Sequence, residues 1–378
     1  MKRVDAMLIS ENNTLETLEP VEGLSVVPEM DKPQSRIIKT VCDGIRMGVH
    51  RPGEQLRLRE AYMKDFSASK VTVQRAFARL IADGFVTARA SQGTFVAARP
   101  PNLFRIALVY NQIKSEALQD KYRLSIVNAA APYDRHHPDY TLVPYYGMDF
   151  EQAGSDRQRL VDDLNHGRLA AVIHTYDHRY WPDDPRLAHI GIPQVHWGES
   201  RGAGYSSVRL ANALRASMAE VKRLGGKKVA VIISSKAMQM IDELMGLAAE
   251  MDLEIRPQWL HGVDKLHPAW ADAIMQTVFS LPEAMRPDSV FVADDHFVEA
   301  AGMGLVKAGV ANTVKAVFHA NFPVAASSPI PAVRVGVDAA QILRATLGIL
   351  ETLWNADRSG QPRPDLAEEV PIQVDTTL

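Results

Sequence analysis

Hydrogen-bond donors gather in one short stretch near the front of the chain, SASKVTVQRAFARLIADGF. Apolar residues recur there at helical spacing, which places Ser69, Lys70 and Thr72 at the start of a helix and Gln74 and Arg75 one turn later. The first N–H groups of a helix and its positive dipole end attract phosphate. Hydroxyl, amide and guanidinium groups beside them can reach phosphates or base edges in a major groove. These residue types at this spacing indicate a helix whose first turns contact nucleic acid.

The charge around this helix differs from that of the rest of the chain. Residues 31–100 contain 13 Lys and Arg and 6 Asp and Glu, so their net charge is 13 − 6 = +7. The whole chain of 378 residues carries −3, which leaves −10 for the remainder. A basic module on an acidic body indicates a polyanionic partner for the module alone, although a solvated basic face remains the alternative.

The elements around the helix form a recognisable order. Expected are helices over 34–49 and 59–66, a third helix between Ser69 and Gly84, and strands over 85–87 and 94–96. Ser67 and Ser69 are both candidates for the N-cap of the third helix, and Gly84 ends it. Three helices followed by a small hairpin predict a winged helix-turn-helix.

Four segments follow from composition and periodicity. They are a flexible tail over 1–30, a winged helix-turn-helix domain over 31–98, a linker over 99–103 and a two-lobed body over 104–378. The linker contains a Pro-Pro pair, which favours extended polyproline geometry. The fold class is therefore α/β, with a winged helix in front of a doubly wound body.

The body alternates short apolar runs with amphipathic stretches. Strands are expected over 105–110, 140–145, 169–175, 192–197, 227–234, 253–260, 288–295, 314–320 and 332–337, and helices over 155–166, 208–224, 238–251 and 338–356. Repeated β-α alternation predicts parallel sheets covered by helices, and the length suits two lobes. Ligands bind such sheets at the carboxyl ends of the strands.

The N-terminal module resembles the DNA-binding domain of GntR-type transcription regulators, through the segments RPGEQL, SASKVTVQRAFARLIADGFV and SQGTFVA. The resemblance implies a DNA face formed by Arg57, Arg59, Ser69, Lys70, Thr72, Gln74, Arg75, Gln92 and Gly93. Glu60 stands where the family has a DNA-contacting arginine, and Arg57 or Arg59 is expected to compensate. The other departures are at Lys70, Gln74 and Ser91, where the family has two arginines and a wing glycine.

The body resembles the sugar-binding effector domain of LacI-type repressors, which is similar to periplasmic binding proteins. The segments that carry this are FRIALVYNQ, RLAAVIHT, IGIPQVHWGE, YSSVRLANALRASMAEVKRLGGKKVAVI and PDSVFVADDHFVEAAGMGLVKAG. By resemblance Asp295 takes the place of a ligand-contacting aspartate, and Glu243 takes that of an arginine that grips the ligand. A GntR-type head on a LacI-type body is similar to arabinose-type repressors.

The remaining effector candidates follow from their places at or near strand ends. Asp295 follows a buried strand, where a carboxylate can accept bonds from ligand hydroxyls beside an aromatic ring. The other candidates are Tyr110, Tyr122, His174, Trp197 and Asn321. For each aromatic residue core packing is an equal alternative, and Asp295 is also a candidate N-cap.

Other chemistries lack their motifs. GAGYSS has no third glycine for a nucleotide site, Ser234 lies in no nucleophile elbow, and His174 with His178 is a weak metal pair behind a strand. The single cysteine, Cys42, excludes an intramolecular disulfide and is expected to be a buried thiol. Absence of a long apolar run and of a secretory signal predicts a cytoplasmic protein without membrane association.

Together these observations predict a ligand-responsive, DNA-binding transcription regulator, most simply a repressor. The expected partners are a palindromic operator, a second copy of the chain and a carbohydrate effector held between the lobes. No enzyme activity, cofactor or metal is expected. The alternatives are an α/β enzyme or a solute-binding protein with an accessory winged helix. The sequence leaves open whether the effector releases or promotes DNA binding.

Overall fold

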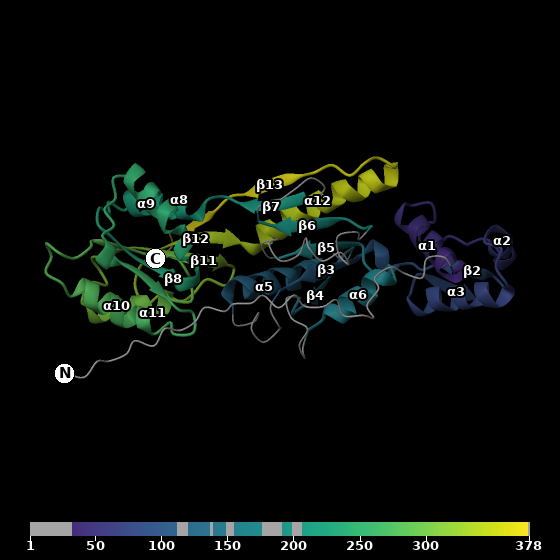
Figure 1. Cartoon of the computed structure of the whole chain (residues 1–378), viewed down its shortest axis with the longest axis horizontal. Helices are drawn as coiled ribbons and strands as arrows, with labels where there is room; N and C mark the ends of the chain where they lie inside the picture. The colour runs from purple at the N-terminus through teal and green to yellow at the C-terminus, as the bar shows by residue number, and fades with distance from the viewer. Residues whose placement is uncertain are drawn as a thin grey trace, which may run out of the picture.

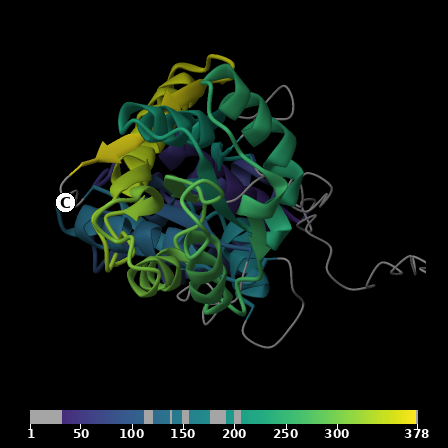
Figure 2. The same cartoon turned by 90° about the vertical axis from the view of Figure 1, so that its left-hand side faces the viewer.

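A winged helix and two α/β lobes lie in line along the long axis of the molecule (Figure 1). The structure is a computed structural model and describes residues 32–111, 120–136, 139–148, 155–175, 191–198 and 206–376. Seen down the long axis, the winged helix lies behind the two lobes (Figure 2). The predicted tail, residues 1–30, lies outside the described residues.

The winged helix has the predicted element order. Its elements are α1 (Pro33–Arg46), α2 (Arg59–Asp65), α3 (Lys70–Ala82), β1 (Val86–Arg89) and β2 (Gly93–Val96). Apolar faces of the helices and the hairpin share one core, which includes Ile37, Phe77 and Val96. Strands β1 and β2 pair antiparallel, which forms the wing. The helix α1 ends three residues before the predicted end, and Gly48 adopts a positive φ of 75° just beyond it.

Lobe 1 lies next to the winged helix. Its elements are β3 (Arg105–Val109), α5 (Lys121–His136), β4 (Thr141–Tyr145), α6 (Arg157–Asn165), β5 (Ala171–His174), β6 (Gln194–Trp197), β7 (Ser206–Leu210), α12 (Ala339–Ser359) and β13 (Ala367–Val370). The strand order is β13-β7-β6-β5-β3-β4, and the paired strands run parallel. The helix α12 packs into the core of this lobe.

Lobe 2 forms the far end of the molecule. Its elements are α8 (Ala213–Arg223), β8 (Val229–Ser234), η3 (Ser235–Met240), α9 (Ile241–Glu250), η4 (Pro257–Trp259), β9 (Leu260–Val263), α10 (Trp270–Phe279), β10 (Ser289–Val292), α11 (Val298–Lys307), β11 (Lys315–Phe322), β12 (Val333–Asp338) and β14 (Gln373–Asp375). The strand order is β14-β12-β11-β10-β8-β9, with β14 antiparallel to β12. The two sheets confirm the predicted two-lobed, doubly wound class.

The chain crosses between the lobes where β7 leads to α8, where β12 leads to α12 and where β13 leads to β14. Val337, at the carboxyl end of β12, packs into the lobe 1 core together with Ala339. The carboxyl edge of the lobe 2 sheet therefore faces lobe 1. Helix α5 of lobe 1 also contacts β11 of lobe 2.

Two predicted elements of the body are wrong. The helix expected over 208–224 is the end of β7 followed by α8, because Asn212 caps a new helix by accepting the Arg215 N–H at 2.8 Å. The strand expected over 253–260 begins only at Leu260. Pro257 has a fixed φ and no N–H to donate, and it starts a short 3₁₀ turn instead. The strands β7, β13 and β14 are short and were not predicted.

The linker is shorter and more compact than an extended polyproline segment. Pro100 is extended, but Pro101–Leu103 form a 3₁₀ turn, and Pro101 and Asn102 are buried. The Asn102 side-chain amide donates to the backbone carbonyl of Cys42 at 2.8 Å. Cys42 is buried as predicted, and burial raises the pKa of its thiol. Within the described ranges, no helix combines the length and apolarity needed to cross a membrane.

Candidate DNA-binding face and effector site

The start of α3 is built by a side-chain cap. Ser69 is the N-cap: its hydroxyl accepts the Thr72 N–H at 3.2 Å and bonds the Thr72 hydroxyl at 2.9 Å. Ser67, the other candidate, instead adopts a positive φ of 48° before the helix. The cap leaves N–H groups of the first turn directed outward at an exposed helix end, a ready site for phosphate.

The outward face of α3 carries long donors along its first turns. Lys70, Gln74 and Arg75 are exposed, and Thr72 is half-buried beside them. Among the described residues neither Lys70 nor Arg75 has an ion-pair partner. Val71 is exposed to 56% on the same face, where an apolar side chain could contact a thymine methyl group. The first half of α3 is therefore a polar surface whose cations are available to a polyanion.

Other arginines of the winged helix are engaged within it. Arg57 pairs with Asp65 at 2.8 Å, Arg59 lies over the Phe77 ring, and Arg79 donates to Asp83 at 2.6 Å. Arg57 and Arg59 remain exposed, so the predicted compensation for Glu60 stays a prediction. Because Arg79 is paired with Asp83, the donors of α3 that are unpaired within the described residues are those of its first half.

The wing tip is held by a side chain from the turn before α2. The Gln55 amide donates to the Gln92 carbonyl at 2.6 Å, which leaves the Gln92 side chain exposed. Gly93 has a φ of 114°, and a Cβ there would lie 2.7 Å from the Gln55 amide nitrogen. Glycine is therefore required at this position. Ser91 replaces the family's first wing glycine and adopts a φ of 60°, which L-residues rarely adopt.

One pair of predicted effector residues meets at the carboxyl edge of the lobe 2 sheet. Asp295, after β10, is 2% exposed, and its carboxylate accepts the Asn321 amide at 2.7 Å. Asn321 pairs in register with Val337, which faces lobe 1. Asp295 does not cap α11. That helix begins at Val298, and the side chain of Asp295 accepts the Asn321 amide instead. Burial raises the pKa of Asp295 above its usual range, against the effect of the Asn321 bond.

Asp294, rather than Asp295, accepts hydrogen bonds from a residue that follows it in the chain. It accepts the His296 N–H at 3.1 Å and the His296 ring nitrogen at 2.7 Å, and it pairs with Lys265 at 2.9 Å. Burial opposes ionisation of Asp294, but the His296 bond and the Lys265 charge together hold its pKa below the usual range. Asp294 is therefore an ionised carboxylate, fixed beside Asp295.

The same residues include donor atoms that are close enough to share a metal ion. Donor atoms of Asp294, Asp295 and His296 lie within 4.8 Å of one another. Lys265 and Asn321 already bond the two carboxylates, which makes the group better suited to ligand hydroxyls than to a cation.

His319 is a neighbour of this group that was not recognised in the sequence. It lies on β11, two residues before Asn321, and burial lowers the pKa of its imidazole despite the nearby Asp295 charge. A neutral imidazole offers one donor and one acceptor to a ligand. Its place on the same strand as Asn321, at the period of two that sets side chains on one face, was the available signal.

The candidate effector residues of lobe 1 differ in how deeply they are buried. Tyr110 is fully buried and stacks on Tyr146 at 4.8 Å between ring centroids, and Tyr122 is half-buried at the start of α5. His174 is fully buried, stacked on His196, with its Nε2 3.0 Å from the Gln194 amide oxygen.

Trp197 lies inside the lobe 1 core rather than at its surface. Its side chain is 3% exposed, and the indole N–H donates to the Thr346 hydroxyl of α12 at 2.8 Å. Core packing, the alternative to ligand contact, is therefore the role that this geometry gives to Trp197.

Glu243, in place of the family's ligand-gripping arginine, is engaged at a crossing between the lobes. Its carboxylate accepts the side-chain amide of Asn212 at 2.6 Å. Asn212 lies between β7 of lobe 1 and α8 of lobe 2, and it also caps α8. Glu243 therefore stabilises the crossing, at the place where the family has its ligand-gripping arginine.

Comparison with known proteins identifies the head of the chain. Residues 33–96 match the family model of bacterial regulatory proteins, gntR family. The HTH-type transcriptional regulator TauR of Rhodobacter capsulatus is 33% identical over 84 residues. Those residues are 22% of this chain, and they span only 17% of the length of that relative.

Solved structures resemble the body. A complex of the transcriptional regulator CelR with cellobiose has a TM-score of 0.54 at 19% identity, over 82% of this chain and 90% of the other. A LacI family transcriptional regulator of Arthrobacter sp. FB24, solved with lactose, also scores 0.54 at 13% identity, over 72% and 97%. At these identities the likeness is one of fold. Residues 33–96 therefore match the helix-turn-helix domain of the gntR family, and the body that follows has a two-lobed fold similar to that of the solved regulators.

Proposed function

We propose that this protein is a transcription regulator, and most simply a repressor, whose affinity for DNA changes when a small carbohydrate binds its body. The observation that carries the proposal is the start of α3. There a capped helix end and the exposed Lys70, Gln74 and Arg75 form a donor surface on a gntR-type domain. A regulator without enzyme activity, working in the cytoplasm beside the chromosome, accounts for this surface.

The DNA contacts are proposed by position along the helix. Ser69, Lys70 and Thr72 at the helix start suit phosphates, since a helix N-terminus orients N–H groups toward an anion. Gln74 and Arg75 lie one turn further and are long enough to reach base edges in the major groove. Gln92 and Gly93 bring the wing tip to the backbone or the minor groove.

The effector is proposed to bind at the carboxyl edge of the lobe 2 sheet. Asp295 and Asn321 lie together there, with His319 on the same strand, and this edge faces lobe 1. A carboxylate beside an amide and a neutral imidazole suits the alternating donors and acceptors of a polyol. Cellobiose and lactose in the solved relatives favour a saccharide. From lobe 1, Tyr110, Tyr122 and His174 are proposed to complete the site.

A homodimer is proposed as the working form. Two winged helices related by a two-fold axis would engage two half-sites, so that the operator is palindromic. A ligand that favours one arrangement of the lobes would shift the spacing of the two heads and thereby the affinity for DNA.

The salt dependence of DNA binding tests the proposed function. The DNA is a duplex selected from random sequences by the full chain, and affinity is measured by fluorescence anisotropy between 50 and 300 mM salt. These concentrations cover about the range in which phosphate contacts lose most of their contribution. We expect the logarithm of the binding constant to fall linearly with the logarithm of salt concentration. Lys70→Ala should reduce the slope by about 2, one phosphate for each subunit of the dimer.

Lys222 provides the matched control for this measurement. It is a lysine on α8 of lobe 2 and pairs with Asp252 at the surface. Helix α8 lies far from α3 (Figure 1). Lys222→Ala should leave both the affinity and the slope unchanged. Failure to select any duplex, or equal slopes for Lys70→Ala and the unchanged protein, would contradict the proposed DNA contacts.

A further inference from the structure

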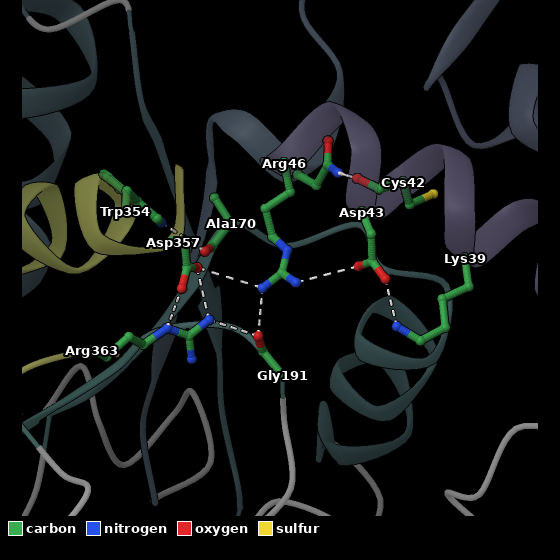
Figure 3. A network of polar contacts seen from close by, with 10 residues as sticks. Lys39, Cys42, Asp43, Arg46, Ala170, Gly191, Trp354, Asp357 and Arg363 are labelled. Carbon is green, nitrogen blue, oxygen red and sulfur yellow. Dashed lines mark hydrogen bonds and ion pairs between the residues drawn. The ribbon is translucent and has the colours of Figure 1, made fainter. Parts of the chain in front are cut away.

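The winged helix is bonded to lobe 1 at two separate places. At the first, Arg46 at the end of α1 pairs with Asp357 near the end of α12 at 3.6 Å and donates to the Gly191 carbonyl at 2.5 Å. Figure 3 shows this guanidinium between Asp43 of its own helix and the two lobe 1 groups. Arg46 and Asp357 are only 14% and 12% exposed, so this is a largely buried ion pair.

The lobe 1 side of this contact is itself fixed. Arg363 forks onto both oxygens of Asp357 at 2.7 and 2.8 Å and also donates to the Gly191 carbonyl (Figure 3). One turn earlier on α12, the Trp354 indole donates to the Ala170 carbonyl at 3.1 Å. A bidentate pair on a packed helix holds the carboxylate in one orientation, so Arg46 meets a preformed acceptor.

The second contact joins the end of α3 to lobe 1. Arg168 pairs with Asp83, directly after α3, at 3.3 Å and with Asp163 of α6 at 2.7 Å. The two carboxylates are 6% and 7% exposed. Asp83 also accepts Arg79, and Asp163 also accepts Arg105 and the Tyr145 hydroxyl. A continuous series of ion pairs therefore links Arg79 of α3 to Arg105 of β3 in the lobe 1 sheet.

Two buried ion pairs and a folded linker restrict the head more than a single covalent tether would. One anchor holds the end of α1 and the other holds the end of α3, so rotation about either one is opposed by the other. The Asn102 bond to the Cys42 carbonyl lies in the segment that connects them. Detachment of the head would break both ion pairs and the bond of Arg46 to the Gly191 carbonyl together, which disfavours it.

We infer that Arg46 and Arg168 are positioning residues, which lock the winged helix onto lobe 1 so that the lobes, rather than a flexible linker, set the spacing of the two half-sites. This inference rests on the proposed function, since it concerns how a DNA-binding dimer measures its operator. In the locked state, only one separation of half-sites matches both heads. The effector can act on DNA binding only through the same rigid connection.

Arg46 and Arg168 can be replaced without leaving their carboxylate partners unpaired. After Arg46→Gln, Asp357 keeps the fork of Arg363, and after Arg168→Gln, Asp83 keeps Arg79 and Asp163 keeps Arg105. The double variant R46Q/R168Q therefore unlocks the head at little cost to either fold. The matched control is R215Q/R223Q, which removes two arginines from surface ion pairs of α8 in lobe 2 and leaves both links between the head and lobe 1 intact.

The first readout varies the distance between two half-sites, one base pair at a time over a helical turn of about 10 base pairs. The unchanged protein and R215Q/R223Q should lose about 100-fold in affinity when the spacing is wrong by half a turn, since the second head can no longer bind. R46Q/R168Q should vary by less than about 10-fold over the series, because mobile heads reach both sites. All proteins should bind a single half-site equally. A spacing preference in R46Q/R168Q as sharp as in the control would overturn the inference.

The second readout needs no DNA. Spin labels on cysteines introduced at the exposed Ala78 of α3 and Glu351 of α12 report the distance between head and lobe 1, in labelled protein diluted with unlabelled protein. We expect a narrow distribution in the unchanged background and a broad one in R46Q/R168Q. A broad distribution in both, or a narrow one in both, would overturn the lock. If the lock is present but no duplex is bound, the proposed function fails and the inference about the structure does not.

Discussion

Replacing Lys70 and Arg75 together by alanine is expected to weaken binding to the selected duplex by at least about 100-fold. Each long donor contributes about 1–3 kcal/mol at a phosphate or a base edge, and a dimer loses both contacts twice. The fold should be unaffected, since both side chains are exposed and, within the described part of the chain, have no ion-pair partner to strand. The unfolding temperature should change little, because alanine is the best helix former.

Lys70 and Arg75 should also differ in how their loss affects the preference for DNA sequence. Lys70 at the helix start is expected to affect all duplexes alike, whereas Arg75 should discriminate between bases. Anisotropy with the selected duplex and with duplexes mutated at single half-site positions separates these effects. The double variant R215A/K222A, on α8 of lobe 2, removes the same charge without touching the head. If it weakens binding as much as K70A/R75A, the contact is not on α3.

Asp295→Asn is expected to lower the affinity for the effector by about 10- to 100-fold, since the amide replaces one acceptor oxygen by an NH₂ group and leaving a buried hydroxyl without its acceptor costs about 1–3 kcal/mol. The change should not destabilise the protein. Burial raises the pKa of Asp295, which means that the ionised form is disfavoured in the folded state, and an amide removes that cost. Calorimetric titration with the bound saccharide and thermal unfolding without it measure the two effects separately.

The control for Asp295 lies in the same lobe. Glu283 is an exposed carboxylate before β10, whereas Asp295 follows that strand, so Glu283→Gln makes the same chemical change at the opposite end. It should leave saccharide binding unchanged. Retention of full affinity by D295N, or an equal loss in both variants, would remove Asp295 from the proposed site.

Local signals explain why the winged helix could be predicted and parts of the body could not. The cap at Ser69 and the glycine at 84 specify the ends of α3 through bonds and dihedral angles within a few residues. The polar strand β7 carries no such signal, since it is short, and its identity comes from pairing with β6 and β13. Sequence periodicity reports which face is buried, not which neighbour covers it.

The same limit applies to the candidate site. The sequence placed Asp295 and Asn321 at strand ends, and parallel pairing brings such ends together. It could not decide whether Trp197 turns toward a ligand or into the core, because its partner Thr346 lies on a helix much later in the chain. The contacts of Arg46 and Arg168 were missed for that reason: each joins domains whose docking no local pattern encodes.

The most direct test of ligand-controlled DNA binding measures one duplex with and without saccharide. Cellobiose, lactose and a panel of monosaccharides, polyols and sugar phosphates are first screened for those that raise the unfolding temperature. Affinity for the selected duplex is then measured by anisotropy with that compound at saturation. We predict a change of about 5- to 150-fold, the range of typical coupling free energies, and an equal factor in saccharide affinity when DNA is bound. A saccharide that binds the body and leaves the affinity for DNA unchanged would contradict the account.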